Sequence, residues 1–249
     1  MVIAAAAGLA SCSGEEEEEE ESPVAESPLT PLPPPPAAWE DGIALAIVYD
    51  TSGSMHERIP GEQGVGTTPK YVVASAALVS VVDRIEAWQK AAPKDAPRRV
   101  EAALVTFGPS GVPMGPFDAE KFRRWAADFN SCIGPTPLGT AILAAGEETV
   151  KSNLLSKHVI VITDGQNTEG PAPEAGMDSL ESRAKGRSCG VSLHFVAFDV
   201  DAAVFSAVKS KGATVVGASD AKQLGERLKS ILEEEILLES AAPAKSVAR

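Results

Sequence analysis

From residue 40 onward, apolar runs of strand length alternate with segments of helical periodicity. Residues 43–49 (IALAIVY) form a continuous apolar run, which is typical of a strand buried on both faces of a sheet. Residues 70–91 instead place apolar side chains at every third or fourth position, which predicts a helix. Because such alternation is the pattern of βαβ units, it predicts a parallel sheet covered by helices.

The same periodicities place further elements along the chain. Strands are expected at 100–107, 158–163, 191–199 and 214–218, and helices at 118–129, 136–152, 173–187, 201–211 and 220–239. A short edge strand is expected at 112–114, where prolines are tolerated. Because crossovers between parallel strands are right-handed, the predicted fold class is α/β: a doubly wound, mostly parallel six-stranded sheet with helices on both faces and one short antiparallel edge strand.

Local signals mark where three of these helices begin. Asp118 is a good N-cap for the second predicted helix. Thr136 is expected to cap the third helix, with Pro137 at its first helical position. Gly176 is expected to weaken the first turn of the fourth helix, because glycine is a poor helix former.

The first 38 residues have a different composition. Residues 1–12 (MVIAAAAGLASC) are signal-like, and the tetrad that ends in Cys12 resembles the lipobox of bacterial lipoproteins, which implies a lipid-modified cysteine. No Lys or Arg precedes the run, and a disordered Ala-rich tip is the alternative. Residues 13–38, with seven consecutive glutamates followed by seven prolines, are expected to be a disordered acidic and Pro-rich linker. The protein is therefore expected to be exported to the bacterial cell envelope as a membrane-anchored lipoprotein, since the apolar run is too short to span a bilayer.

The acidity of the chain is concentrated in this N-terminal region. The formal net charge is −13, but residues 1–41 hold ten acidic residues and no Lys or Arg, which leaves 25 acidic against 22 basic residues elsewhere, or −3. A nearly neutral body with few aromatic residues and no basic cluster argues against a nucleic-acid partner. At the other end, residues 241–249 are small and polar and are expected to form a flexible tail.

Cys132 and Cys189 remain as an even pair if Cys12 is lipid-modified. An oxidising compartment would favour a disulfide between them. The predicted topology instead places them near opposite ends of the sheet, beyond the roughly 7 Å that a bridge spans. It therefore favours free, largely buried thiols.

Polar side chains gather where two apolar strands end. The first strand ends in DTSGS, the strand at 158–163 ends in TDG, and the helix after GPTP starts on the same face. With the strand order 3-2-1-4-5-6, these two strand ends are neighbours at the point where the order reverses, which is where open α/β sheets bind ligands. Five oxygen-bearing residues would converge there: Asp50, Ser52, Ser54, Thr136 and Asp164. Such a set, without nitrogen or sulfur, suits Mg²⁺, or else Mn²⁺ or Ca²⁺.

These motifs resemble the von Willebrand factor type A (VWA) domain and its metal-ion-dependent adhesion site (MIDAS). The resemblance rests on DTSGSM, GPTPLG and VITDG, in that order, and covers residues 40–240. It implies that the two serines and Thr136 are direct ligands, that the two aspartates bind the ion or hold its waters, and that an acidic side chain of a protein ligand completes the coordination. Pro135 stands where the family commonly has glycine, which leaves Thr140 as a weaker alternative to Thr136.

Simpler explanations exist for single residues of this set. Asp50 and Ser52 are also good helix caps, although capping alone does not explain why a second strand ends in a carboxylate. His56 is more simply a solvated loop residue than a general base. His158 and His194 are expected as core or surface residues, and the three histidines lack zinc spacing.

Among functions, a binding module is favoured over an enzyme, and no catalytic residue is predicted. DTSGS is similar to the Asp-Thr-Gly motif of aspartic proteases, but those enzymes need an all-β frame. A metal-dependent hydrolase would lack an evident nucleophile or general acid. The other alternative is a surface lipoprotein in which the metal is only structural. For a binding module, the Gly/Pro-rich loops 56–69 and 165–173 are expected to set specificity.

Overall fold

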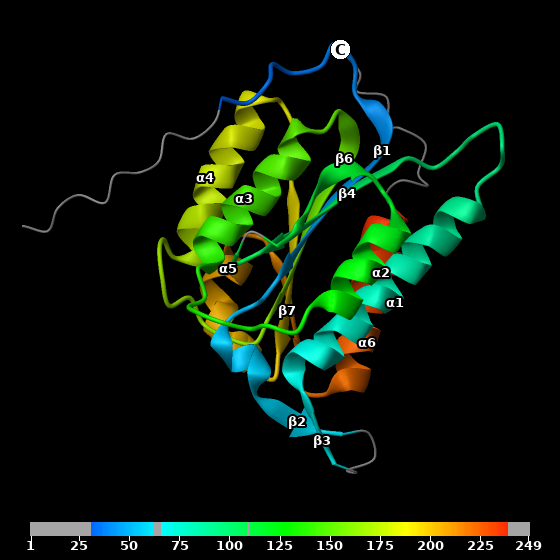
Figure 1. Cartoon of the computed structure of the whole chain (residues 1–249). Coiled ribbons are helices and arrows are strands. Elements are labelled where there is room, and N and C mark those ends of the chain that lie inside the picture. The colour runs from blue at the N-terminus through cyan, green and yellow to red at the C-terminus, as the bar shows by residue number, and fades with distance from the viewer. Residues whose placement is uncertain (1–30, 62–65, 109, 239–249) are drawn as a thin grey trace, which may run out of the picture. The chain divides into compact units, whose positions relative to one another are not determined.

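The computed structural model describes residues 31–61, 66–108 and 110–238. Cys12, most of the predicted linker and the whole predicted tail lie outside these ranges. Along the described chain, strands and helices alternate as the apolar periodicity predicts (Figure 1).

Six strands form the central sheet. They are β1 (Glu40–Tyr49), β4 (Val100–Thr106), β5 (Val112–Pro116), β6 (Leu154–Thr163), β7 (Ser192–Phe198) and β8 (Thr214–Ala218). Their order is β5-β4-β1-β6-β7-β8, which is the predicted 3-2-1-4-5-6. All neighbours pair in parallel except β5, which runs antiparallel to β4 at the edge. The predicted fold class is confirmed.

Helical segments cover both faces of the sheet (Figure 1). They are η1 (Gly53–His56), α1 (Lys70–Lys90), α2 (Ala119–Asp128), α3 (Leu138–Lys151), α4 (Pro173–Gly186), η3 (Ala202–Phe205), α5 (Ser206–Ser210), α6 (Ala221–Ser230) and the π-helical turn η4 (Ile231–Ile236). α1, α2 and α6 lie against one face, and α3, α4 and α5 lie against the other. Successive side chains of β1 alternate between the faces, so that Ile47 belongs to the first core and Val48 to the second.

The pairing of β1 with β6 determines where the polar strand ends meet. Tyr49 lies opposite Ile162, and the Asp50 amide donates to the Ile162 carbonyl at 3.1 Å. The residues that follow the two strands therefore lie side by side at one edge of the sheet. β1 and β6 are also the strands between which the order reverses, so the expected position for a ligand site is occupied by polar residues.

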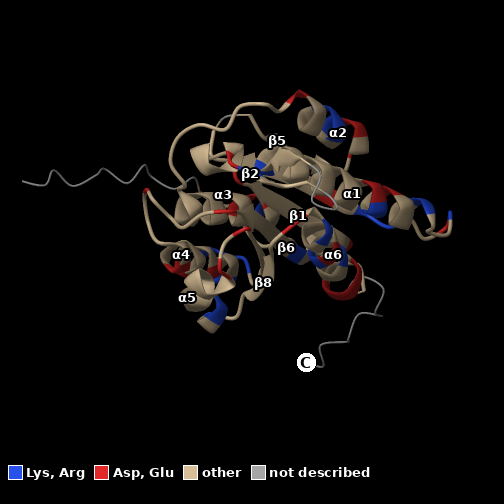
Figure 2. Ribbon diagram, turned by 90° about the horizontal axis from the view of Figure 1, so that it is seen from below, with Lys and Arg blue, Asp and Glu red and all other residues tan. Residues whose placement is uncertain are grey.

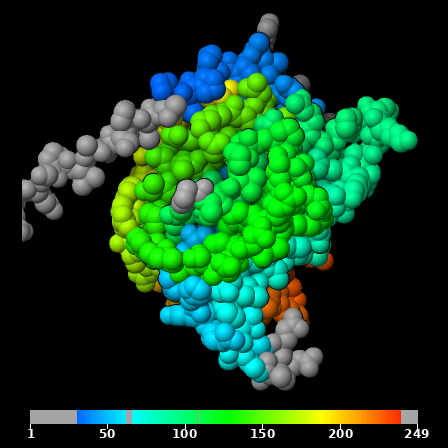
Figure 3. All heavy atoms as spheres, viewed as in Figure 1, coloured from blue at the N-terminus to red at the C-terminus, as the bar shows by residue number. Residues whose placement is uncertain are grey.

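A small hairpin after η1 was not predicted. Strands β2 (Arg58–Pro60) and β3 (Thr67–Pro69) pair antiparallel, and each has only three residues. The hairpin (cyan) projects at the bottom of Figure 3, beyond the carboxyl end of β1. Strands this short, with proline in both, carry no readable alternation of apolar and polar residues.

The expected N-caps have different outcomes. Asp118 caps α2, because its side chain accepts from the amides of Glu120 and Lys121. The expectation for Thr136 is wrong, since α3 begins at Leu138 with Pro137 as its N-cap and no side-chain cap bond. An N-cap carbonyl accepts the first intrahelical bond, but here the Ala141 amide donates to the Pro137 carbonyl at 3.0 Å, whereas the Thr136 carbonyl accepts from the Thr168 amide at 3.0 Å.

The two described cysteines are free thiols, as predicted. Cys132 is buried, and burial raises the pKa of its thiol to about 12. Cys189 is only half-buried, so the expectation of largely buried thiols holds for the first of the two. Within the described ranges, none of the helices is both long enough and apolar enough to cross a bilayer.

Candidate metal centre

Asp50 is the first residue after β1, and its side chain is buried. Its Oδ1 accepts from the Ser52 amide at 2.8 Å and from Ser52 Oγ at 2.5 Å, and its Oδ2 accepts from Thr163 Oγ1 at 2.6 Å. Burial raises the pKa of this carboxyl, although the hydrogen bonds from Ser52 and Thr163 act to lower it. These described partners are all neutral, and a buried carboxylate without a cation is costly. Asp50 therefore marks a place that favours a positive charge.

The two serines of DTSGS turn towards each other and towards the second strand end. Ser52 Oγ lies 3.1 Å from Ser54 Oγ, which donates to Asp164 Oδ1 at 2.7 Å. Ser52 is the extended N-cap of the 3-10 turn η1, and Ser54 is the second residue of that turn. Close oxygen–oxygen contacts of 2.5, 3.1 and 2.7 Å thus run from Asp50 to Asp164 through both hydroxyls, which is the convergence that the sequence predicts.

Thr136 completes the set from the loop before α3. It is buried, and a Cβ atom at Gly165 would lie 3.7 Å from Thr136 Oγ1 and 3.8 Å from Ser54 Oγ. The two hydroxyls therefore flank the same glycine. Thr140 is exposed, and its hydroxyl lies near Gly170 instead, 3.1 Å from the position of a Cβ there. The structure thus places Thr136, and not Thr140, beside the serines.

Three charged residues of this edge were missed from the sequence. Lys70, the first residue of α1, is buried, and its Nζ lies 3.0 Å from Asp164 Oδ2. The same ammonium contacts Glu57 Oε2 at 2.9 Å and Asp199 Oδ2 at 3.1 Å. Burial acts to lower the Lys70 pKa, but the hydrogen bonds to the three carboxylates outweigh it and raise the pKa. Asp199 could have been predicted from the sequence, because it directly follows a third parallel strand, β7, whose carboxyl end lies at the same edge. Lys70 lies at the start of a helix and has no comparable sequence signal.

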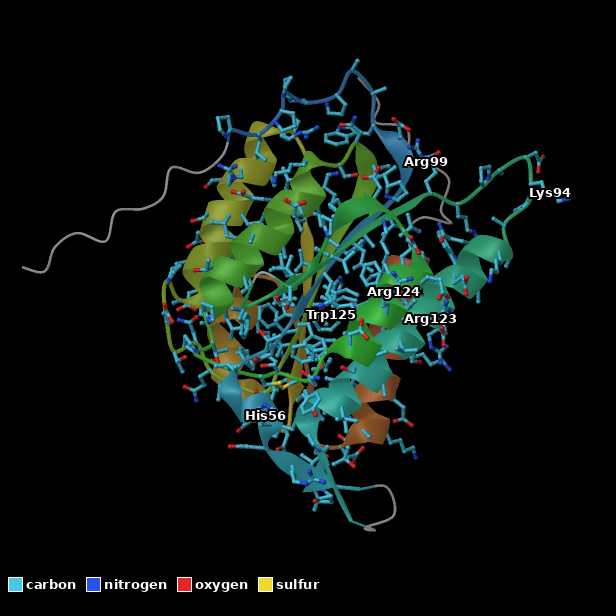
Figure 4. The ribbon with its side chains drawn as sticks, in the orientation of Figure 1. His56, Lys94, Arg99, Arg123, Arg124 and Trp125 are labelled. Atoms are coloured by element: carbon cyan, nitrogen blue, oxygen red, sulfur yellow. The ribbon has the colours of Figure 1, made fainter. Side chains whose placement is uncertain are left out.

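His56 lies in η1 at this end of the sheet (Figure 4). It is exposed, as expected of a loop residue. Its Nε2 accepts from the Cys132 amide at 3.3 Å, and its ring meets the Tyr71 ring edge-on at a centroid distance of 5.3 Å. His56 therefore links η1 to the loop before α3.

His158 and His194 are buried side by side within β6 and β7, towards the opposite end of the sheet. His158 Nδ1 lies 3.3 Å from His194 Nε2, and His194 Nδ1 lies 3.1 Å from Glu235 Oε2. Burial lowers the pKa of His158 to about 3 and also lowers the pKa of His194. Both are core residues, in agreement with the first of the two expectations.

Acidification is expected to destabilise the fold through this pair. Below its ordinary pKa of about 6.5, His158 takes up a proton in the unfolded chain but stays neutral in the folded chain, so its stabilising contribution is full above that pH and is lost as the pH falls towards 3. From pH 7 to pH 5.5, the free energy of unfolding should fall by about 1 kcal/mol from this residue alone. Urea denaturation at both pH values checks this. His158→Gln should show a smaller pH dependence than the wild type, and equal slopes in both proteins would contradict the assignment.

The donor set fits a hard divalent cation. Hydroxyl and carboxylate oxygens meet beside a buried carboxylate that has no cationic partner among the described residues. Within the described ranges, there is no group of three or more His, Cys, Asp or Glu side chains arranged to hold a metal ion. Binding at this edge would therefore depend on the hydroxyls, a ligand type that suits Mg²⁺ better than softer metals.

The architecture is similar to that of several solved structures, although the sequence has no match. No protein-family model and no curated protein sequence matches the chain. Among solved structures, the vWF domain of the type V pili tip protein Mfa5 from Porphyromonas gingivalis aligns with a TM-score of 0.55 and 14% identity, over 78% of this chain and 96% of that one. The fold is VWA-like.

Two further structures share the VWA-like fold. The PilB minor pilin from Streptococcus sanguinis aligns with a TM-score of 0.59 and 13% identity, over 83% of this chain and 63% of that one. Proximal thread matrix protein 1 from the mussel byssus, with a zinc-occupied MIDAS motif, aligns with a TM-score of 0.55 and 15% identity, over 79% and 48%. This chain thus spans less than two thirds of the length of either protein. At such identities the likeness establishes the fold alone.

Proposed function

We propose that this VWA-like domain is a divalent-cation-dependent protein-binding module that serves in adhesion or interaction. The observation that carries the proposal is the connected set of hydroxyls and carboxylates from Asp50 to Asp164 at one edge of the sheet. Ser52, Ser54 and Thr136 would hold the cation directly, and the two aspartates would hold it or its waters. The cation, Mg²⁺ or else Mn²⁺ or Ca²⁺, would supply a positive centre for an acidic side chain of a protein ligand.

The surroundings of the site support binding to a partner at this end. Gly53 is exposed and Ser54 half-buried, whereas Asp50 and Ser52 are buried behind them. Figure 2 views the domain from this end, with β2 in view. The described parts of the loops 56–69 and 165–173 lie around the same edge, where they would set specificity. MIDAS-containing and pilus proteins among the structural neighbours agree with such a role.

Two other functions are weighed against this proposal. In a surface lipoprotein with a purely structural metal, the chain's own oxygens would complete the coordination sphere of the cation and leave no position for a partner. A metal-dependent hydrolase would need a general acid or base beside the cation. The histidine nearest to the two serines in sequence is His56, and its Nε2 instead accepts a hydrogen bond from the Cys132 amide. We therefore propose no catalytic role and no catalytic residue.

The location of the protein is proposed from the N-terminal sequence. We propose export to a bacterial cell envelope, with lipid modification of Cys12 as the membrane contact and no nucleic-acid partner. The pilus origin of the structural neighbours is compatible with the cell surface. Mass spectrometry of the mature protein from a bacterial host checks the anchor, since an unmodified Cys12 would reject it.

An open cation site should accept a carboxylate from outside. In the Mn²⁺-loaded protein, a short peptide with blocked termini and one aspartate is expected to displace metal-bound water and to lower the relaxation enhancement of water protons. The same peptide with asparagine is the control, because it lacks the charge and the second carboxylate oxygen. If neither peptide changes the relaxation while Mn²⁺ stays bound, the cation is structural and the interaction proposal fails.

A further inference from the structure

Lys70 places a permanent cation inside the candidate metal centre. It is 3% exposed and opens α1, whose first turn has no acidic residue. The start of a helix carries a positive partial charge, and burial removes water from the ammonium, so this is an unfavourable position for a lysine. What holds it there are the three carboxylates around Nζ, each at 3.1 Å or less.

These three carboxylates differ in their relation to the metal site. Asp164 is shared, because its Oδ1 accepts from Ser54 while its Oδ2 contacts Lys70. Glu57 and Asp199 contact Lys70 but do not belong to the predicted ligand set. Their side chains are 68% and 40% exposed, which leaves them room to follow the ammonium. Lys70 thus has one partner inside the site and two beside it.

We infer that Lys70 is an internal counter-cation: it pairs with Asp164 when no metal is bound, and it stays on Glu57 and Asp199 when Asp164 binds a divalent cation. The inference rests on the proposed metal site and adds the residue that sets its affinity. Two like charges cannot share one carboxylate without repulsion, so Lys70 weakens metal binding. Glu57 and Asp199 reduce that penalty, because they keep the displaced ammonium paired.

Removing the ammonium should strengthen metal binding. Lys70→Met keeps an unbranched, slightly shorter side chain without the charge, and we expect its Mn²⁺ affinity to rise roughly tenfold by calorimetry, since the competing charge is gone. In EDTA the variant should melt below the wild type, because Asp164 loses its cation, and Mn²⁺ should raise its melting temperature by more. Lys90→Met is the matched control, since Lys90 pairs with Glu86 on an exposed part of α1; it should match the wild type in Mn²⁺ affinity.

Removing the two outer carboxylates should have the opposite effect. In Glu57→Gln/Asp199→Asn the displaced ammonium has no second partner, and we expect Mn²⁺ affinity to fall roughly tenfold. Direct attraction of Mn²⁺ by these carboxylates would produce the same fall, so the test is repeated with Lys70→Met also present. If the carboxylates act through Lys70, their removal then changes little. A fall of the same size with Lys70→Met present would overturn the inference.

The outcomes separate this inference from the proposed function. If the wild type binds Mn²⁺ and Lys70→Met binds it equally, Lys70 does not set the affinity, while the metal site stands. If neither protein binds Mn²⁺, both proposals fail together. Tighter binding by Lys70→Met, with the carboxylate effect dependent on Lys70, supports the internal counter-cation.

Discussion

Replacing Ser52 and Ser54 by alanine is expected to lower Mn²⁺ affinity by roughly 100-fold or more, because even partners outside the ligand shell typically contribute 10- to 100-fold. The two hydroxyls connect Asp50 to Asp164. Without them, two carboxylates and Thr136 are too few donors for a cation that prefers six oxygens. Isothermal titration calorimetry of the full chain measures the change directly.

A matched double variant separates this effect from a general loss of serines. Ser182→Ala/Ser210→Ala removes two exposed hydroxyls, which donate to the carbonyls of Asp178 and Ser206 within their own helices. It should bind Mn²⁺ as the wild type does. Equal affinity in all three proteins would reject the site, provided that circular dichroism shows each of them folded.

Gly176→Ala is expected to lower the free energy of unfolding by about 2–3 kcal/mol, through overpacking of the α3–α4 contact. A Cβ atom at Gly176 would lie 2.3 Å from the Gly139 carbonyl oxygen. The obstructing atom belongs to the backbone, so the two helices must separate. Apolar contacts along both helices weaken with them, because the residues on the facing sides form part of one core.

The matched control for this substitution is Gly186→Ala, in the last turn of the same helix. Gly186 is exposed, and nothing lies within 4 Å of a Cβ there. Alanine is the better helix former by up to about 1 kcal/mol, so this variant should be unchanged or slightly more stable. Urea denaturation of both variants gives the comparison. A Gly176→Ala protein as stable as Gly186→Ala would contradict the close helix contact.

The central sheet was predictable because burial leaves a local trace in the sequence. β8 coincides with the predicted 214–218, and α1 ends one residue before the predicted 91. A strand buried on both faces must be apolar throughout, and a helix on a sheet must be apolar every third or fourth position. The β2–β3 hairpin had no such trace, because Ile59 alone among its six strand residues is buried.

The convergence of the polar strand ends was predictable from the sequence, and the binding of a cation there stays a prediction. The strand order and the rule that ligands bind at strand ends bring Asp50 and Asp164 together without any knowledge of side chains. The prediction that Thr136 caps α3 was wrong, because a capping signal depends only on the next few residues of the sequence. The Thr136 backbone instead bonds to Thr168, 32 residues away.

By itself, the sequence determined the fold class, the order of the strands and the edge where five oxygen-bearing residues meet. Only the tertiary structure showed that Lys70 forms an ion pair with Asp164, 94 positions away in the chain, and that Gly176 lies against the backbone of another helix. The physical reason is range. Periodicity records whether a residue faces the core, which its neighbours in sequence reveal. A buried ion pair or a close backbone contact joins residues that only folding brings together, and neither leaves a repeating pattern.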